Sequence, residues 1–148
     1  MKNASLCTAL ALIVATCFLG QATSEPNQSE AAAQLFKAGK FTEAGEIYAR
    51  IVAPDPKDYS AVLQLGRVAL LANRLDDAQR WLEAAIALRP GDDDAKVMLA
   101  ETFYRRDDFQ KAAAALGGVE VGSNKLIIEQ FPTLNVAKLE SFKGQTPY

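Results

Sequence analysis

The sequence predicts an all-α protein in which three helix pairs stack into an α-solenoid. Three observations predict this fold. A short motif recurs three times without gaps, at one fixed interval. Between its copies, apolar residues recur at the spacing of a helix face. Pro56 and Pro90, separated by the same interval, mark places where a helix must stop. A fixed period of about 34 residues is typical of repeat architectures built from helix pairs.

The first element is an N-terminal leader, assigned to residues 1–24. Lys2 precedes an apolar run from Leu6 to Leu19, which is followed by small residues. This order is typical of a secretory signal peptide. The run is shorter than the roughly 20 apolar residues that a membrane-spanning helix needs. We therefore expect export, to the periplasm or outside the cell, and no membrane insertion after cleavage.

The recurring motif marks the turn inside each helix pair. It starts at Gly39, Asn73 and Asp107, and these residue types adopt the left-handed conformation at the lowest cost. Each can therefore end one helix and reverse the chain before the next. A small residue five positions later lets two helices approach closely. These small residues are Ala44, Ala78 and Ala112.

The middle helix pair has the clearest boundaries. Asp58 can cap a helix that runs to about Leu71, and a second helix is expected from about Leu75 to Leu88. Acidic residues gather where helices begin, as the helix dipole favours. The three successive aspartates from Asp92 are one such helix start, because they lack the spaced ligands of a calcium loop. The pairs are assigned to residues 25–58, 59–92 and 93–118.

Residues 119–148 leave the repeat. The apolar run Leu126-Ile127-Ile128 predicts a short helix that ends before Pro132. We expect this helix to cover the exposed end of the third pair, because terminal repeats need such cover to stay soluble. A last amphipathic piece and an extended end follow it.

The helix pairs resemble the tetratricopeptide repeat (TPR) family. The family pattern Trp-x2-Leu-Gly-x2-Tyr, Ala-x3-Phe, Pro is met in the middle pair by Val62, Leu65, Gly66, Ala69, Ala78, Leu82 and Pro90. The resemblance implies a right-handed solenoid whose first helices line a concave groove for a peptide or protein partner. By position, it places these residues in the groove: Phe36, Lys37, Leu63, Arg67, Leu70, Val97, Glu101, Tyr104 and Arg105.

Two of these groove positions carry arginine. We expect Arg67 and Arg105 to contact the partner, because a charge inside a groove is costly unless it is paired. The apolar members can pack against neighbouring helices as well, and both roles stay open. The two-carboxylate clamp of chaperone-binding TPR domains needs Lys and Asn in the first pair, where this chain has Ser29 and Ala33. The resemblance therefore does not extend to that clamp.

The composition excludes several classes of function. The chain has no His, and both of its Cys lie in the leader, so the usual side chains for general-base catalysis and zinc binding are missing. A net charge of −2 without basic clusters does not suit a nucleic-acid surface. We therefore expect a non-enzymatic protein without catalytic residues, metal or cofactor, whose partner is a protein or peptide.

A second function stays open beside an exported adaptor that holds a partner in its groove. The stretch from Asn135 to Tyr148 resembles the linker of exported bacterial proteins in which a TPR segment precedes a retropepsin-like aspartyl protease domain. The Asp-Thr/Ser-Gly motif of that domain is not in the chain. The resemblance implies an accessory segment of a truncated or split hydrolase. The identity of the partner and the oligomeric state do not follow from the sequence.

Overall fold

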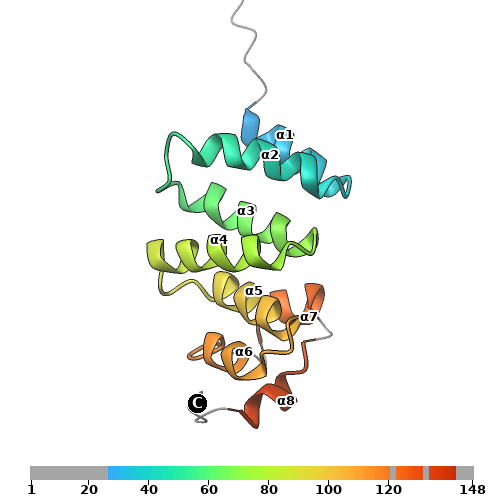
Figure 1. Ribbon diagram of the computed structural model, residues 1–148, viewed down its shortest axis with the longest axis vertical. Coiled ribbons are helices and arrows are strands. Elements are labelled where there is room, and N and C mark those ends of the chain that lie inside the picture. Colours follow the sequence, from blue (N-terminus) through green and yellow to red (C-terminus); the bar gives the residue numbers. More distant parts are fainter. Residues whose placement is uncertain (1–26, 121–122, 132–133, 143–148) are drawn as a thin grey trace, which may run out of the picture.

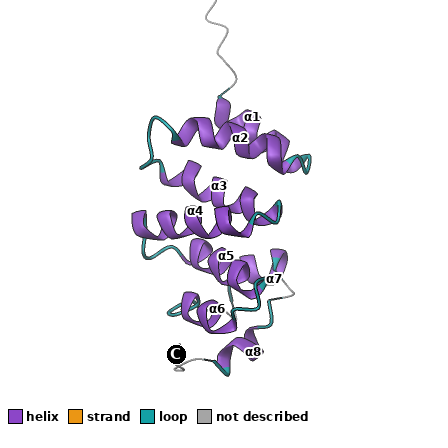
Figure 2. Ribbon diagram, viewed as in Figure 1, coloured by secondary structure: helices purple, strands orange, loops and turns teal. Residues whose placement is uncertain are grey.

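The computed structural model describes residues 27–120, 123–131 and 134–142. These ranges contain helices and no strand (Figure 2). The leader expected at residues 1–24 lies outside them. None of the described helices is both long and apolar enough to cross a membrane. In chain order the helices are α1 (Gln28–Lys37), α2 (Phe41–Val52), α3 (Tyr59–Leu71), α4 (Leu75–Leu88), α5 (Asp93–Tyr104), α6 (Phe109–Ala115), α7 (Lys125–Gln130) and α8 (Val136–Glu140).

The helices α1 to α6 form three pairs that stack along the long axis of the molecule (Figure 1). Each pair contacts the next mainly through the second helix of one and the first helix of the following pair. This arrangement confirms the α-solenoid of three helix pairs. The boundaries expected for the middle pair agree with α3 and α4, because turn and cap residues specify them locally.

The turn inside each pair has the same backbone conformation. Gly39, Asn73 and Asp107 have φ angles of 74°, 57° and 60°, in the left-handed region. The N–H of the residue after each one donates to the carbonyl oxygen five residues earlier, at 2.9, 2.8 and 3.0 Å. This six-residue hydrogen bond is the Schellman motif, which satisfies carbonyl groups at the end of the first helix. The predicted role of the three residues is confirmed.

The starts of α3 and α5 are also alike. Asp58 Oδ1 accepts a hydrogen bond from the backbone N–H of Ala61, and Asp92 Oδ1 accepts one from Ala95, both at 3.1 Å. Each bond satisfies one of the free N–H groups at a helix N-terminus. The run of aspartates from Asp92 is thus the start of α5, as the sequence predicts.

Small residues allow the two helices of a pair to approach closely. Ala44, Ala78 and Ala112 are fully buried. In the middle pair, a Cβ atom built on Gly66 would lie 2.9 Å from side-chain atoms of Leu82. A larger residue there would push α3 away from α4.

The segment after the repeats forms two short helices with different neighbours. α8 contacts α6 at the end of the stack, whereas α7 lies beside α5 (Figure 1). The helix expected around Ile127 therefore exists and ends before Pro132, but it packs on the side of the first helices, and α8 lies at the end of the stack. The side chains of Leu126 and Ile128 lie outside the described part of the structure.

Candidate partner-binding face

The nine residues expected to contact a partner come from the first helices of the three pairs and from the C-cap of the last of these helices. We call the surface formed by α1, α3 and α5 the first-helix face. Of the nine residues, Phe36 and Lys37 lie on α1, and Leu63, Arg67 and Leu70 lie on α3. From α5 come Val97, Glu101 and Tyr104, and the C-cap residue of this helix is Arg105.

Arg67 connects three helices across this face. Its Nη2 donates a hydrogen bond to Oε1 of Gln130, at the end of α7, over 2.6 Å. Its Cζ lies 4.8 Å from the centre of the Phe36 ring of α1, within the range of a cation–π interaction. The Nε atom of Arg67 is buried and has no hydrogen-bond partner among the described residues. The guanidinium is therefore held in place but not fully satisfied.

Burial controls the electrostatics around Arg67. It lowers the pKa of the Arg67 guanidinium, and the nearby Asp94 and Tyr48 oppose this effect. Burial also raises the pKa of the Asp94 carboxyl and of the Tyr48 hydroxyl. An arginine stays protonated in proteins, so Arg67 presents a partly desolvated positive charge at the middle of the first-helix face.

Arg105 is satisfied within the chain. Its Nε donates to Oε1 of Glu101 at 2.6 Å, and its Nη1 donates to the carbonyl oxygen of Leu70 at 3.2 Å. The Glu101 side chain is only 2% exposed, against 33% for Arg105. Glu101 Oε2 is buried without a hydrogen-bond partner in the described ranges. Arg105 therefore compensates a buried carboxylate and ties α5 to the end of α3, whereas Arg67 still has an unused donor.

The expected contact residues differ in exposure. Leu70, Val97 and Glu101 are buried. Leu70 and Val97 belong to the same apolar cluster as Ile127 and Phe131 of the C-terminal segment. Among the other expected residues, Phe36, Leu63, Arg67 and Tyr104 are half-buried, and Lys37 and Arg105 are exposed. Residues 123–131 therefore reach the part of the face that the third pair contributes.

Three residues near Arg67 were not expected from the sequence. Asp94 and Tyr48 act on its charge, and Gln130 accepts its hydrogen bond. Asp94 follows the N-cap of α5 by two positions. In the sequence, this cluster of aspartates indicated only the start of a helix and no contact with Arg67. Gln130 lies outside the repeats, so no repeat position could indicate that it meets Arg67.

A cavity of about 240 Å³ lies between α2 and α4, away from the first-helix face. Trp81 and Arg74 line it. Asp77, which also lines the cavity, lies 3.6 Å from Arg74 and 2.9 Å from Arg80. These exposed ion pairs contribute little to stability.

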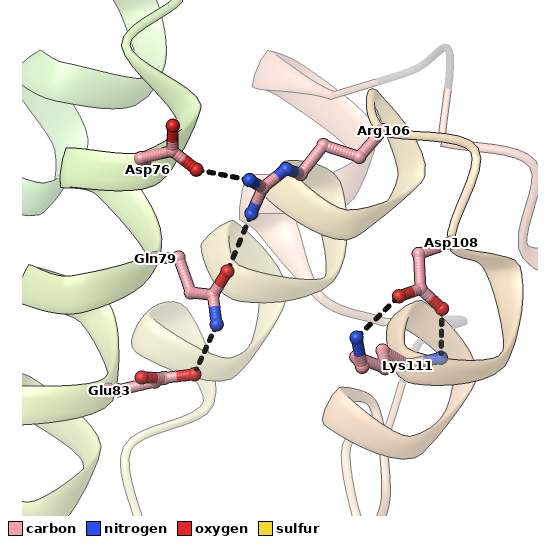
Figure 3. Close-up of polar contacts among 6 residues, drawn as sticks. All are labelled: Asp76, Gln79, Glu83, Arg106, Asp108 and Lys111. Carbon is pink, nitrogen blue, oxygen red and sulfur yellow. Dashed lines mark hydrogen bonds and ion pairs between the residues drawn. The ribbon is translucent and has the colours of Figure 1, made fainter. Parts of the chain in front are cut away.

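A polar network joins the second and third pairs on the α4 side. Arg106, in the turn after α5, contacts Asp76 and donates to Oε1 of Gln79 at 2.6 Å (Figure 3). Gln79 in turn donates to Glu83 at 2.8 Å. The described residues include no group of three or more His, Cys, Asp or Glu that could hold a metal ion.

Solved structures with a similar fold include those of one chaperone, the type III secretion translocator chaperone SycD of Yersinia enterocolitica. Its alternative dimer is 17% identical with a TM-score of 0.65, and the match covers 78% of this chain and 89% of that one. Its complex with a peptide of the translocator YopD is 19% identical, with a TM-score of 0.65 and the same coverage. A further structure of SycD is 19% identical with a TM-score of 0.65, and the match covers 78% of this chain and 81% of that one.

Family models give a more specific result than these distant structures. No curated protein matches the chain. Two models, each described as tetratricopeptide repeat, match residues 35–88 and 63–118. Together they span residues 35–118, which is more than half of the 148 residues. The chain belongs to the tetratricopeptide repeat family.

Proposed function

We propose that this protein is an adaptor that binds a peptide segment of a partner protein on its first-helix face. The observation that carries the proposal is the state of Arg67. It is a half-buried cation in the middle pair, it contacts α1 and α7, and its Nε has no acceptor in the described ranges. Buried polar atoms are normally paired, so a site with an unpaired donor is suited to a ligand that brings an acceptor.

The fold comparison supports the same function. SycD, which has a similar fold, is described in complex with a peptide of its translocator YopD. A protein of this architecture can therefore hold a peptide. We extend to this chain only the class of partner, a protein or peptide, because the identity is only 19%. We further propose that the protein does not act as an enzyme, since the chain has no His and its two Cys lie in the expected leader.

Two finer statements are part of the proposal. The adaptor is exported, because residues 1–24 have the order of a signal peptide. It acts by itself and not as the accessory segment of a hydrolase. The alternative has less support, because residues that resemble a protease linker form α8, and Leu139 of that helix is 1% exposed against the repeat.

The test captures the partner by photo-crosslinking. A photo-reactive amino acid placed at Lys37, which is exposed at the end of α1, should crosslink a protein from an envelope extract. The same group placed at Arg50 on α2 should not. Arg67→Glu should lower the yield at position 37 about tenfold, a loss of roughly 1.4 kcal/mol in binding. Lys57→Glu, in the exposed turn between α2 and α3, is the matched control.

The variants avoid Arg105 for a structural reason. Reversing its charge would place a second carboxylate beside the buried Glu101 and would unfold the protein by a route unrelated to binding. Equal crosslinking from positions 37 and 50, or an unchanged yield in Arg67→Glu at an unchanged melting temperature, would show that the first-helix face does not bind the partner.

A further inference from the structure

A helix of the chain itself, α7, packs on the first-helix face. α7 contacts α5 (Figure 1), and Gln130 at its end accepts a hydrogen bond from Arg67 on α3. Ile127 and Phe131 are buried in the cluster that contains Leu70 and Val97. The segment therefore meets the face through the apolar side chains of Ile127 and Phe131, which are four positions apart, and through the polar side chain of Gln130.

The hydrogen bond from Arg67 to Gln130 uses only the Nη2 donor of the guanidinium edge formed by Nε and Nη2. The Nε–H and one Nη2–H of a guanidinium point from the same edge, and a carboxylate matches that edge with its two oxygens. Gln130 presents one oxygen, which accepts from Nη2. Its other polar atom is an NH₂ group, which is a donor and cannot accept from Nε. The unpaired Nε of Arg67 is the direct result.

A carboxylate in the position of the Gln130 amide would remove this defect. It would accept from both Nη2 and Nε, and the bonds would be charge-assisted. The positive charge of Arg67 is available for such a bond, because the buried carboxylate of Glu101 is paired with Arg105 instead. The carboxyl of Asp94, which acts on the charge of Arg67, does not accept from Nε, since that atom has no partner in the described part of the chain.

We infer that α7 is a weak occupant of the partner site, and that the partner is a short amphipathic helix with a carboxylate side chain where Gln130 stands. The partner helix would carry apolar residues at the places of Ile127 and Phe131 and Asp or Glu at the place of Gln130. It displaces α7 from α5 and accepts hydrogen bonds from both Nε and Nη2 of Arg67. This inference rests on the proposed function and gives the chemistry of the partner at the same site.

The test uses two synthetic peptides as probes. One has the sequence of residues 123–142 of this chain, and the other is identical except for Gln130→Glu. Each is added to the whole chain, and binding is measured by fluorescence anisotropy. The peptide with Glu should bind about tenfold more tightly. Amides 125–130 of the chain should then exchange faster with deuterium, because α7 has been released. With the Arg67→Gln chain, the two peptides should bind equally.

Three results would overturn the inference. The peptides could bind the unmodified chain with equal affinity, which would mean that Nε of Arg67 is not a carboxylate donor. The tighter peptide could bind without faster exchange at 125–130, which would place its site elsewhere. The difference between the peptides could also persist in the Arg67→Gln chain, and Arg67 would then have no part in it.

A second measurement needs no partner and no peptide. Gln130→Glu in the chain itself should slow deuterium exchange of amides 125–130 about tenfold, because the intramolecular bond to Arg67 becomes bidentate. Gln130→Met, which keeps the length of the side chain and removes the acceptor, should speed this exchange. Unchanged exchange in both variants contradicts the inference even if the crosslinking experiment succeeds. Slower exchange in Gln130→Glu without any captured partner contradicts the proposed function alone.

The same variant distinguishes a separate partner from a second copy of this chain. If two copies exchanged their α7 segments, Gln130→Glu would form a dimer whose fraction rises with concentration in sedimentation velocity. A monomer at all concentrations is the expected result. A dimer would overturn the choice of partner, since the carboxylate helix would then be supplied by the protein itself.

Discussion

The first and third helix pairs are built alike but have different surroundings. In the first pair, the rings of Phe36 and Phe41 meet edge to face with centroids 5.5 Å apart at 64°. In the third pair, Tyr104 and Phe109 stand at the equivalent positions, 5.4 Å apart at 63°. The repeat thus sets the geometry inside a pair so closely that two different aromatic residues reproduce one arrangement.

The surroundings of these two aromatic pairs are different. Phe109 also contacts the ring of Phe142, and its ring centre lies 3.4 Å from the Nζ of Lys138; both residues belong to the C-terminal segment. Phe36 instead lies against Arg67 of the neighbouring pair. Position in the repeat therefore determines what a side chain packs against within its pair, while the segments outside the pair determine which further side chains it contacts.

The largest effect should come from removing the basic residue at the end of the first helix in the first and third pairs. We expect Arg105→Ala to lower the free energy of unfolding by about 2–3 kcal/mol, because it leaves the carboxylate of Glu101 buried and unpaired. This is less than for a fully buried pair, since Arg105 is one-third exposed. Lys37→Ala, at the equivalent exposed position, should change stability by less than about 0.5 kcal/mol. Urea unfolding measures both.

A double variant identifies the cause of the Arg105 effect. Glu101→Gln with Arg105→Ala should recover part of the loss, because a buried amide costs less than a buried charge. No recovery would mean that the bond from Arg105 to the Leu70 carbonyl, and not the ion pair, carries the stability.

The turns of the two pairs provide the next largest effect. Gly39→Ala should lower the free energy of unfolding by about 1 kcal/mol, because Ala is strained at a φ of 74° although no atom lies near its Cβ. At the equivalent position Asp107→Gly should change it by less than about 0.5 kcal/mol, because relief of the left-handed conformation is offset by the greater freedom of unfolded Gly. Thermal unfolding of the two variants measures both changes in stability. A loss in Asp107→Gly as large as that in Gly39→Ala would contradict this explanation.

The cap of α6 makes stability depend on pH. Asp108 accepts from the Lys111 ammonium at 2.8 Å and from its backbone N–H at 3.2 Å (Figure 3). The hydrogen bond with the Lys111 side chain holds the pKa of Asp108 below its usual value. The folded pKa is therefore lower than the unfolded one, so the stabilisation is complete above about pH 4 and is lost as pH falls through the folded pKa.

Replacing this cap tests the pH dependence. Asp108→Ala should cost about 1 kcal/mol at pH 7. The difference from the unmodified protein should shrink as the pH is lowered below about 4, because both proteins then lack the charged cap. A difference that stays constant down to about pH 2 in a series of urea unfolding curves would exclude the carboxylate as its origin.

The smallest effect should come from giving the first pair the cap that the third pair has. Lys40 stands at the position equivalent to Asp108 and makes no capping hydrogen bond to α2. Lys40→Asp should raise the free energy of unfolding by about 0.5 kcal/mol, less than a full cap because the exposed pair with Glu43 is lost. A lower melting temperature would show that the start of α2 cannot use the added carboxylate.

The sequence predicts the parts of this fold that depend on neighbours along the chain. The left-handed residue at Asn73 and the cap at Asp58 act through hydrogen bonds that span only three to five residues. A single sequence is enough to recognise such signals, and the helices α3 and α4 begin and end where they predict. The expected leader and the boundaries assigned to the repeats remain predictions.

The candidate site depends on contacts that are distant in sequence. Sequence reasoning placed Arg67 and Arg105 in equal roles, since both are charged residues at expected groove positions. The structure distinguishes them through Glu101, four residues before Arg105, and Gln130, sixty-three residues after Arg67. The first of these pairs could have been found from its helical spacing. The second depends on the fold of a segment without a repeat, and no local pattern indicates it.

The matching ends of the helix pairs have a consequence for how this protein can change in evolution. Residues 59–92 begin after one aspartate cap and end on the next, with the same left-handed turn between them as in both neighbours. A tandem duplication of this stretch would insert a complete pair without creating a new kind of junction. Each duplication would lengthen the surface formed by the first helices by one helix, so longer partner segments could be accommodated in whole steps while the terminal helices kept their own contacts.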